Sequence, residues 1–465
     1  MWWTLWWTLW ATLARADDLE LVLRDPVGQA APGDRCDAEP CLRLLGLIRG
    51  AQRSIDLAFY GFRDQSALLA ALQEARARGV VIRGVVDADV HGANLYRSTA
   101  AWMAALPGFH TDQAVDVASA ATRAGRFAHL RDRCPRPTGR AGPLQCLAFT
   151  LDDDRCLLVA HASRDPIRFE GDILHDKFAV VDGRWVWTGS TNASDSGTGG
   201  YNANLVAVID SPTVAGWYTS EFEQMYLGGR FHGAKEAQGP MRTVLSDGTG
   251  LEVLFSPQHQ PLTRAVVPRI AAARRSIDIA VFFLTHKEVA QALIDAHRRG
   301  VAVRVILDAS GAANEYSKHD VLRLAGIPVK IEDLGGKMHA KTAVIDGEWV
   351  VAGSMNWTGA GDRDNDENTL LIASRAQAAA LEAWFEVLWT RLGDRWLSGR
   401  PDPESRDSGT SCSDGADNDY DGRIDGDDEG CGAAPPPVEP PAAYHIVERH
   451  GAACTWALLA PPEAR

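Results

Sequence analysis

An internal duplication constrains the fold of this chain more than any other feature of its sequence. The segment LHDKFAVVDGRWVWTGSTN, residues 174–192, has a near copy in MHAKTAVIDGEWVVAGSMN, residues 338–356. The similarity extends upstream, where AQRSIDLAFYGF at residues 51–62 matches ARRSIDIAVFFL at residues 273–284. A repeat of this size indicates two related halves rather than a solenoid of short units.

The hydrophobic pattern of each half predicts a strand, a helix and a second strand. In the first half a β-branched run at residues 55–60 precedes an Ala/Leu-rich helical pattern at 66–78, and an apolar run follows at 80–86. The second half repeats this order at 277–283, 287–299 and 301–307. Strands that are apolar throughout are typical of a buried, largely parallel sheet covered by helices.

We therefore predict an α/β fold with two homologous halves, each a mainly parallel mixed sheet flanked by helices. The halves, residues 17–235 and 236–400, are expected to pack as one bilobal catalytic unit. A small irregular acidic tail follows at residues 401–465.

The first half is longer than the second. From Asp87 to His175 the chain advances 88 positions, whereas from Asp308 to His339 it advances 31, a difference of 57. We place this insertion near residues 88–170. It contains Trp102, His129 and three of the eight cysteines. Long insertions in α/β folds form surface loops or lids, so the segment is either a lid or disulfide-stapled decoration.

Each half carries the pattern H-x-K-x-x-x-x-D followed by Gly-Ser-x-Asn. On a strand, residues two positions apart face the same side, so the histidine and the lysine share a face. The Asp-Gly pair predicts a hairpin turn, and the returning strand brings serine and asparagine to the same end. The first set is His175, Lys177, Asp182, Ser190 and Asn192, and the second is His339, Lys341, Asp346, Ser354 and Asn356.

Two such sets together suit phosphodiester chemistry. Two lysines with serine and asparagine donors form an anion cradle for nonbridging phosphate oxygens. One neutral imidazole can attack phosphorus, and a second, protonated imidazole can protonate the leaving alkoxide. Because the lysines supply the positive charge, we expect no cofactor in catalysis.

These motifs and the duplicated halves resemble the phospholipase D superfamily over roughly residues 40–395. The resemblance implies that both motifs meet in one site and that the reaction passes through a covalent phosphohistidine. It implies phosphate contacts for Lys177, Lys341, Asn192 and Asn356, with Ser190 and Ser354 in support. By analogy His175 is the nucleophile and His339 the acid/base, although the pseudo-symmetry leaves the assignment open. The motif aspartates Asp182 and Asp346 complete the catalytic motifs, with a structural role favoured.

The family pattern often includes an acidic residue after Gly-Ser-x-Asn that hydrogen-bonds a catalytic histidine. The second half offers Glu367 in DNDENTLLI, whereas the first half has Asn204 in GYNANLVAV. A carboxylate stabilises an imidazolium more than an amide does. We therefore predict an asymmetric site in which one imidazole is oriented by a charge.

The resemblance leaves the substrate open. The net charge of −14 falls mostly on the tail, where fourteen acidic and four basic residues leave about −4 for residues 1–400. The body has no Lys/Arg stripe of the kind that binds polyanions tightly. We favour a secreted phospholipase D-type phosphodiesterase, a monomer that contacts membrane surfaces transiently and hydrolyses or transfers phosphatidyl groups. The alternative is an endonuclease, and a cardiolipin synthase or a non-catalytic phosphate binder ranks lower.

The N-terminal sequence MWWTLWWTLWATLARADD predicts export. Its apolar run from Trp2 to Leu13 is too short to span a bilayer, and Ala-Arg-Ala at 14–16 is a cleavage pattern. We predict a signal peptide at residues 1–16 and a secreted, periplasmic or cell-envelope location; the alternative is a Trp-rich interfacial helix. The even number of cysteines favours structural disulfides, of which Cys412–Cys431 is the pair that we predict.

The tail contains the loop CSDGADNDYDGRIDGDDEGC between a linker and a Pro-rich spacer. Its acidic residues follow the spacing of an EF-hand-like loop, although position 12 is Asp instead of Glu. We predict a structural Ca²⁺ site here, and the alternative is a solvated acidic linker. The expected ligands are Asp417, Asp419, Asp421, Asp425 and Asp428.

Overall fold

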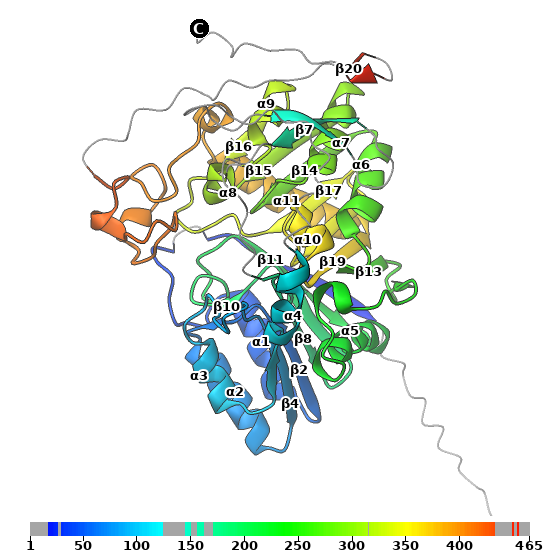
Figure 1. Ribbon diagram of the computed structural model, residues 1–465, viewed down its shortest axis with the longest axis vertical. Coiled ribbons are helices and arrows are strands. Elements are labelled where there is room, and N and C mark those ends of the chain that lie inside the picture. The colour runs from blue at the N-terminus through cyan, green and yellow to red at the C-terminus, as the bar shows by residue number, and fades with distance from the viewer. Residues whose placement is uncertain are drawn as a thin grey trace, which may run out of the picture.

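The computed structural model describes residues 17–26, 29–123, 145–149, 156–161, 171–314, 316–432, 449–450 and 453–454. Two large sheets form the body, and Figure 1 shows the second half above the first. The first sheet has seven strands. In spatial order they are β1 (Asp18–Arg24), β11 (Asn204–Asp210), β9 (Trp185–Gly189), β8 (Lys177–Val181), β2 (Ser54–Phe59), β4 (Val81–Val86) and β5 (Phe109–Thr111).

The second sheet repeats this order and adds one edge strand, for eight strands in total. In spatial order they are β12 (Arg242–Val244), β13 (Gly250–Ser256), β19 (Glu367–Ala373), β18 (Trp349–Gly353), β17 (Lys341–Ile345), β14 (Ser276–Val281), β15 (Ala302–Leu307) and β16 (Val329–Ile331). The predicted α/β class, the duplication and the mixed sheets are confirmed.

Parallel pairing is confined to one side of each sheet, which is less than a mainly parallel sheet would have. Only β2–β4–β5 and β14–β15–β16 pair in parallel within the two sheets. The Asp-Gly turns fold β8 onto β9 and β17 onto β18, and these hairpins are antiparallel as predicted.

Helices cover the sheets on both faces. In the first half they are α1 (Glu39–Gly50), α2 (Ser66–Ala77), α3 (Thr99–Ala105), α4 (Gln113–Arg123) and α5 (Pro212–Tyr226). In the second half they are α6 (Val267–Ala272), α7 (Lys287–Arg298), α8 (Ala309–Ala313), α9 (His319–Leu324), α10 (Gly359–Arg363) and α11 (Arg375–Arg391). Short one-turn segments lie at Leu262–Val266, His232–Ala234, Asp394–Leu397, Ser411–Ser413 and Asp425–Asp427.

The two halves share one hydrophobic core. Apolar side chains from α5 and α11 and from both sheets belong to a single buried cluster. The Tyr218 ring of α5 makes edge contacts with Phe178 of the first sheet and Phe255 of the second, at centroid distances of 5.0 and 5.1 Å. Each half also has its own outer cluster beneath its other helices. This continuous burial holds the two sheets in a fixed relation.

The extra residues of the first half lie later in the chain than predicted. β5 begins 23 positions after the end of β4, and β16 begins 22 positions after the end of β15, so the halves match up to this point. Trp102 belongs to the core, because it lies on α3, is 3% exposed and stacks on Phe62 at 4.0 Å. The insertion therefore follows β5 rather than starting near residue 88. His129 and Cys134 lie outside the described residues.

Part of this insertion reaches the other half. Strands β6 (Gln145–Phe149) and β7 (Cys156–His161) form an antiparallel hairpin, and β7 lies against α7 of the second half. Two further small pairings are β3 (Phe62–Arg63) with β10 (Ala193–Ser194) and β20 (Arg449–His450) with β21 (Ala453–Cys454).

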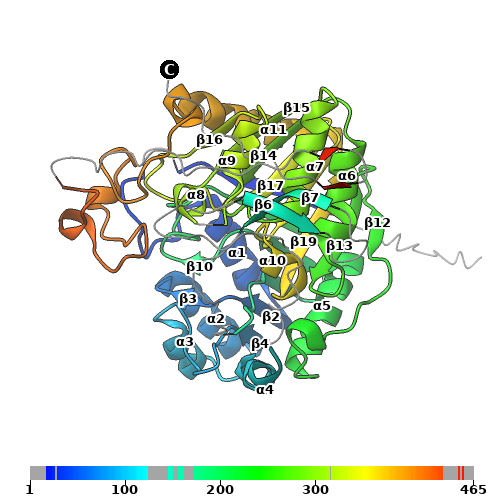
Figure 2. The same cartoon turned by 45° about the horizontal axis from the view of Figure 1, so that its top comes forward.

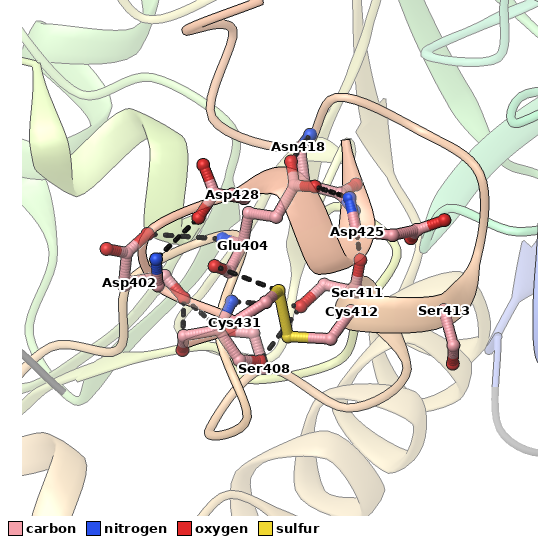
Figure 3. The surroundings of a disulfide bond; sticks show 12 residues. Asp402, Glu404, Ser408, Ser411, Cys412, Ser413, Asn418, Asp425, Asp428 and Cys431 are labelled. Atoms are coloured by element: carbon pink, nitrogen blue, oxygen red, sulfur yellow. Dashed lines mark hydrogen bonds between the residues drawn. A yellow bond between two sulfur atoms is a disulfide. The ribbon is translucent and has the colours of Figure 1, made fainter. Parts of the chain in front are cut away.

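Residues 401–432, here called the acidic module, fold as an irregular unit beside the seam between the halves (Figures 1 and 2). The predicted disulfide Cys412–Cys431 is confirmed and lies at its centre (Figure 3). A second disulfide joins Cys36 to Cys41. The predicted signal peptide lies outside the described residues. Among the helices that are described, none has the length and apolar character needed to cross a bilayer.

Candidate active site

Each motif histidine is anchored on a strand of the opposite half. The His175 backbone N–H donates to the Asp366 carbonyl at 2.9 Å, directly before β19. In the matching place, the His339 N–H donates to the Ala203 carbonyl at 2.9 Å, directly before β11. These reciprocal bridges bring the two H-x-K motifs to one seam along the pseudo-twofold arrangement of the halves.

A carboxylate from the second half orients the first histidine. The Glu367 oxygens lie 2.8 and 2.9 Å from His175 Nδ1, and the Ser354 hydroxyl donates to Glu367 Oε2 at 2.7 Å. Glu367 is completely buried, and burial raises its pKa well above the usual range although Lys177 and Ser354 oppose the shift. The predicted charge-oriented imidazole is thus His175, reached across the seam.

An amide occupies the matching place beside the second histidine. Asn204 Oδ1 lies 3.2 Å from His339 Nδ1 and also accepts from the Ser190 hydroxyl at 2.8 Å. The two imidazoles therefore have the same arrangement with different partners, a carboxylate and an amide. This is the asymmetry that the sequence comparison predicts.

Both motif lysines are buried beneath the histidines. Lys177 Nζ donates to the His175 carbonyl at 2.5 Å, and Lys341 Nζ donates to the His339 carbonyl at 2.6 Å. Burial lowers the pKa of Lys177 to about 7, and burial with the charge of Lys177 lowers the pKa of Lys341 well below its usual range. Burial and both lysines likewise hold the pKa of His175 and His339 well below normal. The site thus disfavours positive charge on these four side chains, and an anionic phosphate bound among them would raise their pKa values.

The asparagines and serines of Gly-Ser-x-Asn take different positions. Asn192 Oδ1 and Asn356 Oδ1 are buried and have no hydrogen-bond partner among the described residues, which fits amide groups that can bind a phosphate. The Ser190 hydroxyl bonds to Asn204 and to the Leu205 backbone, and Ser354 bonds to Glu367. The serines therefore support the groups that hold the imidazoles instead of facing a phosphate.

The motif aspartates lie on the hairpin turns. The Asp182 carboxylate accepts the backbone N–H groups of residues 52, 53 and 54, and Asp346 accepts those of residues 274, 275 and 276. Both have φ of 55°, in the left-handed region. Both carboxylates clamp a turn to the start of the neighbouring strand, which agrees with the structural role that the sequence favours.

Aromatic side chains that sequence reasoning missed pack on the two imidazoles. The Tyr60 ring lies 5.6 Å from the His175 ring, and the Phe282 ring lies 5.0 Å from the His339 ring. These aromatics also lie 5.7 and 5.0 Å from Nζ of the motif lysines. They occupy equivalent positions directly after SIDLAF and SIDIAV, so alignment of the two repeats could have identified them.

A buried ionic cluster, also missed, lies behind His175. His232 is 1% exposed, with Nδ1 3.1 Å from Asp366 Oδ2 and Nε2 3.3 Å from Asp112 Oδ2. Lys235 Nζ lies 2.8 Å from Asp366 Oδ1. Burial opposes the charge on His232, but these carboxylates raise its pKa to about 10, while His232 and Lys235 lower the pKa of Asp366 to about 2. The cluster fixes the residue whose carbonyl holds His175.

The acidic module brings only part of the predicted calcium ligands together. Carboxylates of Asp419, Asp421 and Asp428 approach one another within 4.8 Å, as do those of Glu404, Asp417 and Asp419. Asp425 is not part of either group, because its carboxylate accepts the backbone N–H groups of residues 414 and 415. Figure 3 shows Glu404 between Asn418 and Asp425, a position that only the fold reveals.

Two α/β halves that bring two imidazoles, two lysines and two buried asparagine side chains into one site define a phosphodiester-processing enzyme of the paired-motif kind. A family model described as "Cardiolipin synthase, PLD-like domain" matches residues 156–226 and 266–389. A mitochondrial cardiolipin hydrolase from Xenopus laevis is 34% identical over 179 residues, covering 36% of this chain and 85% of the relative. The chain therefore belongs to the phospholipase D superfamily and is a phosphodiester hydrolase.

Two further comparisons concern a second curated relative and the fold. A phospholipase D from Rickettsia prowazekii is 37% identical over 124 residues, covering 26% of this chain and 60% of the relative. The solved structure of a phosphatidylserine synthase from Haemophilus influenzae has a TM-score of 0.50 at 14% identity, covering 82% of this chain and 89% of that one. The latter likeness supports the two-half fold alone.

Proposed function

We propose that the protein is a secreted phospholipase D-type phosphodiesterase that hydrolyses or transfers phosphatidyl groups. The observation that carries the proposal is the shared site, in which both H-x-K pairs meet and only His175 has a carboxylate partner. Relatives named cardiolipin hydrolase and phospholipase D support a lipid substrate.

We propose His175 as the nucleophile and His339 as the acid/base. With Nδ1–H donated to Glu367, the Nε2 lone pair of His175 forms the N–P bond as the P–O bond to the leaving alcohol breaks. His339 donates its proton to the departing alkoxide. It then accepts a proton from water or from an acceptor alcohol, whose oxygen attacks phosphorus and breaks the N–P bond.

Substrate binding promotes the protonated form of His339 that these reaction steps need. Burial, Lys341 and Lys177 hold the pKa of His339 low. A phosphodiester anion between the lysines offsets their charge and raises the pKa of His339. The acid therefore forms when substrate is bound. The two lysines supply positive charge that stabilises the transition state, and we propose on this ground that the chemistry needs no metal ion.

The assay that tests the proposal offers the purified protein phosphatidylcholine vesicles and plasmid DNA, each with EDTA. Choline release without DNA nicking is the expected result, and nicking without choline release would establish the endonuclease alternative instead. His175→Ala and His339→Ala are each expected to abolish turnover. Near-normal activity of either variant would contradict the shared site.

Export is proposed on the signal-peptide pattern and the disulfides. Expression of the full chain in a secreting host is expected to yield a mature N-terminus at Asp17. Retention of the Trp-rich segment in the purified protein would support the interfacial-helix alternative.

We also propose that the acidic module binds Ca²⁺ through its grouped carboxylates. Asp417 Oδ1 is buried without a hydrogen-bond partner and belongs to a group with Glu404 and Asp419. Calorimetry is expected to show millimolar or tighter affinity. Asp417→Asn should weaken binding, whereas Asp425→Asn should weaken it less, because Asp425 lies outside both groups. Absence of binding heat at millimolar Ca²⁺ would contradict the proposal and favour the alternative of a solvated acidic linker.

A further inference from the structure

The acidic module holds both halves of the body at the seam. From the second half, Lys337 Nζ donates to the Asn418 carbonyl at 2.7 Å and lies 4.4 Å from the Tyr420 ring centroid. From the first half, the Tyr201 hydroxyl donates to Asp414 Oδ2 at 2.7 Å. The acidic module is therefore attached to both halves of the body beside the seam (Figures 1 and 2).

These contacts lie next to the second motif histidine. Lys337 is two residues before His339, and its carbonyl accepts the Ala203 N–H at 2.8 Å. Asn204, which follows Ala203, forms the hydrogen bond with the His339 imidazole. Tyr201 lies two residues before Ala203 in the same segment. The module thus contacts the two segments, at Tyr201 and Lys337, that lead into Asn204 and His339.

The exposed Tyr420 of the module also acts electrostatically on aromatic residues beside the first motif histidine. Tyr420 is 59% exposed. Burial and Asp87 raise the pKa of Tyr60, and the Tyr420 phenol adds to the shift, as it does for Tyr96. Tyr60 packs on His175, and Tyr96 packs edge-on against Tyr60 at 5.4 Å. Tyr420 therefore adds to the electrostatic surroundings of the aromatic residues beside His175, while its direct contact is with Lys337.

The module carries a dense negative charge at this position. Residues 401–432 contain eleven acidic and two basic side chains, a net charge of −9. Duplex DNA carries one charge per about 1.7 Å of axis, so a bound strand presents several phosphates within a Debye length of about 8 Å. A phospholipid presents one phosphodiester. Like-charge repulsion therefore acts far more on nucleic acid.

We propose that the acidic module is a specificity element of the substrate entrance. Tyr420 and Lys337 form its edge, and its charge disfavours polyanionic nucleic acid relative to a phospholipid. The inference rests on the proposed phosphodiesterase function and adds substrate selection to it.

The test neutralises the two charges that flank Tyr420 in the double variant Asp419→Asn/Asp421→Asn. A thymidylate 20-mer is titrated against hydrolysis of bis(p-nitrophenyl) phosphate, a singly charged diester, with EDTA present. The inhibition constant of the 20-mer is expected to fall roughly five- to tenfold at low salt and much less in 0.5 M NaCl. Because Asp419 and Asp421 also belong to the proposed Ca²⁺ site, EDTA keeps Ca²⁺ out of both proteins, and the rate of each protein on the small diester alone serves as its own reference.

A matched control neutralises Glu74 of the first half and Glu236 of the second, which are exposed elsewhere on the body, as Glu74→Gln/Glu236→Gln. This control should leave the inhibition constant unchanged. An equal drop in both double variants, or no drop in Asp419→Asn/Asp421→Asn, would overturn the inference. Melting temperatures of the variants check that the module remains folded.

Fluorescence anisotropy of a labelled 20-mer separates this inference from the proposed function. The dissociation constant is expected to fall in Asp419→Asn/Asp421→Asn, whether or not the protein turns over a diester. If the small diester is not hydrolysed, the proposed function fails, while unchanged anisotropy in the double variant refutes the entrance role by itself.

Discussion

At the scale of single residues, the two imidazoles differ in one partner. Glu367 faces His175 Nδ1, and Asn204 faces His339 Nδ1. A carboxylate keeps the proton on Nδ1 and stabilises positive charge on the ring as the N–P bond forms. An amide fixes the ring without this charge. The structure thus gives the two histidines different chemical capacities despite their equivalent sequence positions.

Glu367→Gln is expected to lower kcat on the order of 10²-fold or more, with a small change in KM, because the carboxylate acts on the reacting imidazole and not on substrate binding. Steady-state hydrolysis of bis(p-nitrophenyl) phosphate measures this effect. A wild-type kcat would show that Glu367 does not assist His175.

The converse variant, Asn204→Asp, tests the same asymmetry from the other side. A carboxylate beside His339 is expected to raise its pKa and to shift the pH–rate profile toward higher pH. A profile that coincides with wild type would contradict the pairing of Asn204 with His339.

Burial of the lysines is expected to cost stability. Burial lowers the pKa of Lys177 from its usual value to about 7, so in the folded protein its charged form is disfavoured. Between pH 7 and 10.5 the lysine binds a proton in the unfolded chain but not in the folded protein. The free energy of unfolding is therefore highest above pH 10.5 and decreases as the pH falls toward 7. Lys177→Met should therefore raise Tm at pH 7 by a few degrees, roughly 2–4 °C per kcal/mol, while abolishing activity. Calorimetry at pH 7 measures the shift, and a lower Tm would contradict it.

At the scale of elements, the hairpin turns depend on their aspartates. Asp182 closes the turn between β8 and β9 and accepts three backbone N–H groups from the chain that enters β2. The same arrangement recurs at Asp346. The last position of H-x-K-x-x-x-x-D is thus part of how the strand is held.

Asp182→Ala is expected to destabilise the protein by about 1–3 kcal/mol, because it leaves backbone donors without an acceptor and places alanine at positive φ. Asp182→Asn keeps an acceptor and tolerates the left-handed region, so its cost should be smaller. Urea unfolding measures both variants. Equal losses for Ala and Asn would contradict the role of the side-chain oxygen.

At the scale of the whole molecule, the seam depends on the cluster around His232. The Asp366 carboxylate forms ion pairs with His232 and Lys235, and its backbone carbonyl accepts a hydrogen bond from the His175 N–H. Asp112 lies at the end of β5 in the first half, whereas Asp366 lies directly before β19 in the second. The buried cation therefore joins carboxylates from the two halves directly behind the site.

His232→Gln is expected to destabilise the protein by about 3–5 kcal/mol, because buried Asp112 loses the cation beside it and Asp366 keeps only Lys235. The pKa of His232 is raised to about 10, so its stabilisation is full below about pH 6.5 and is lost as pH rises through 10. The difference in unfolding free energy between wild type and variant should therefore shrink from pH 6 to pH 10. A difference that does not vary with pH would contradict an imidazolium at this position.

Local spacing carried much of the fold and of the site. Alternation on a strand put His175 with Lys177 and His339 with Lys341, and the Asp-Gly turns returned Asn192 and Asn356. The repeat also predicted that Glu367 had only an amide counterpart. The positions of the histidines, lysines and asparagines follow from periodicity and turn geometry within about twenty residues, so the sequence by itself determined them, whereas the role of Glu367 was implied by the family resemblance.

Only the tertiary structure decided which half serves which histidine. The bridges from Asp366 to His175 and from Ala203 to His339 join positions more than 130 residues apart, and no local pattern encodes them. The same reason applies to His232 among its carboxylates and to the acidic module at the seam. Packing of the two sheets around one shared core fixes these positions, because burial constrains the whole surface of each half and not any single segment.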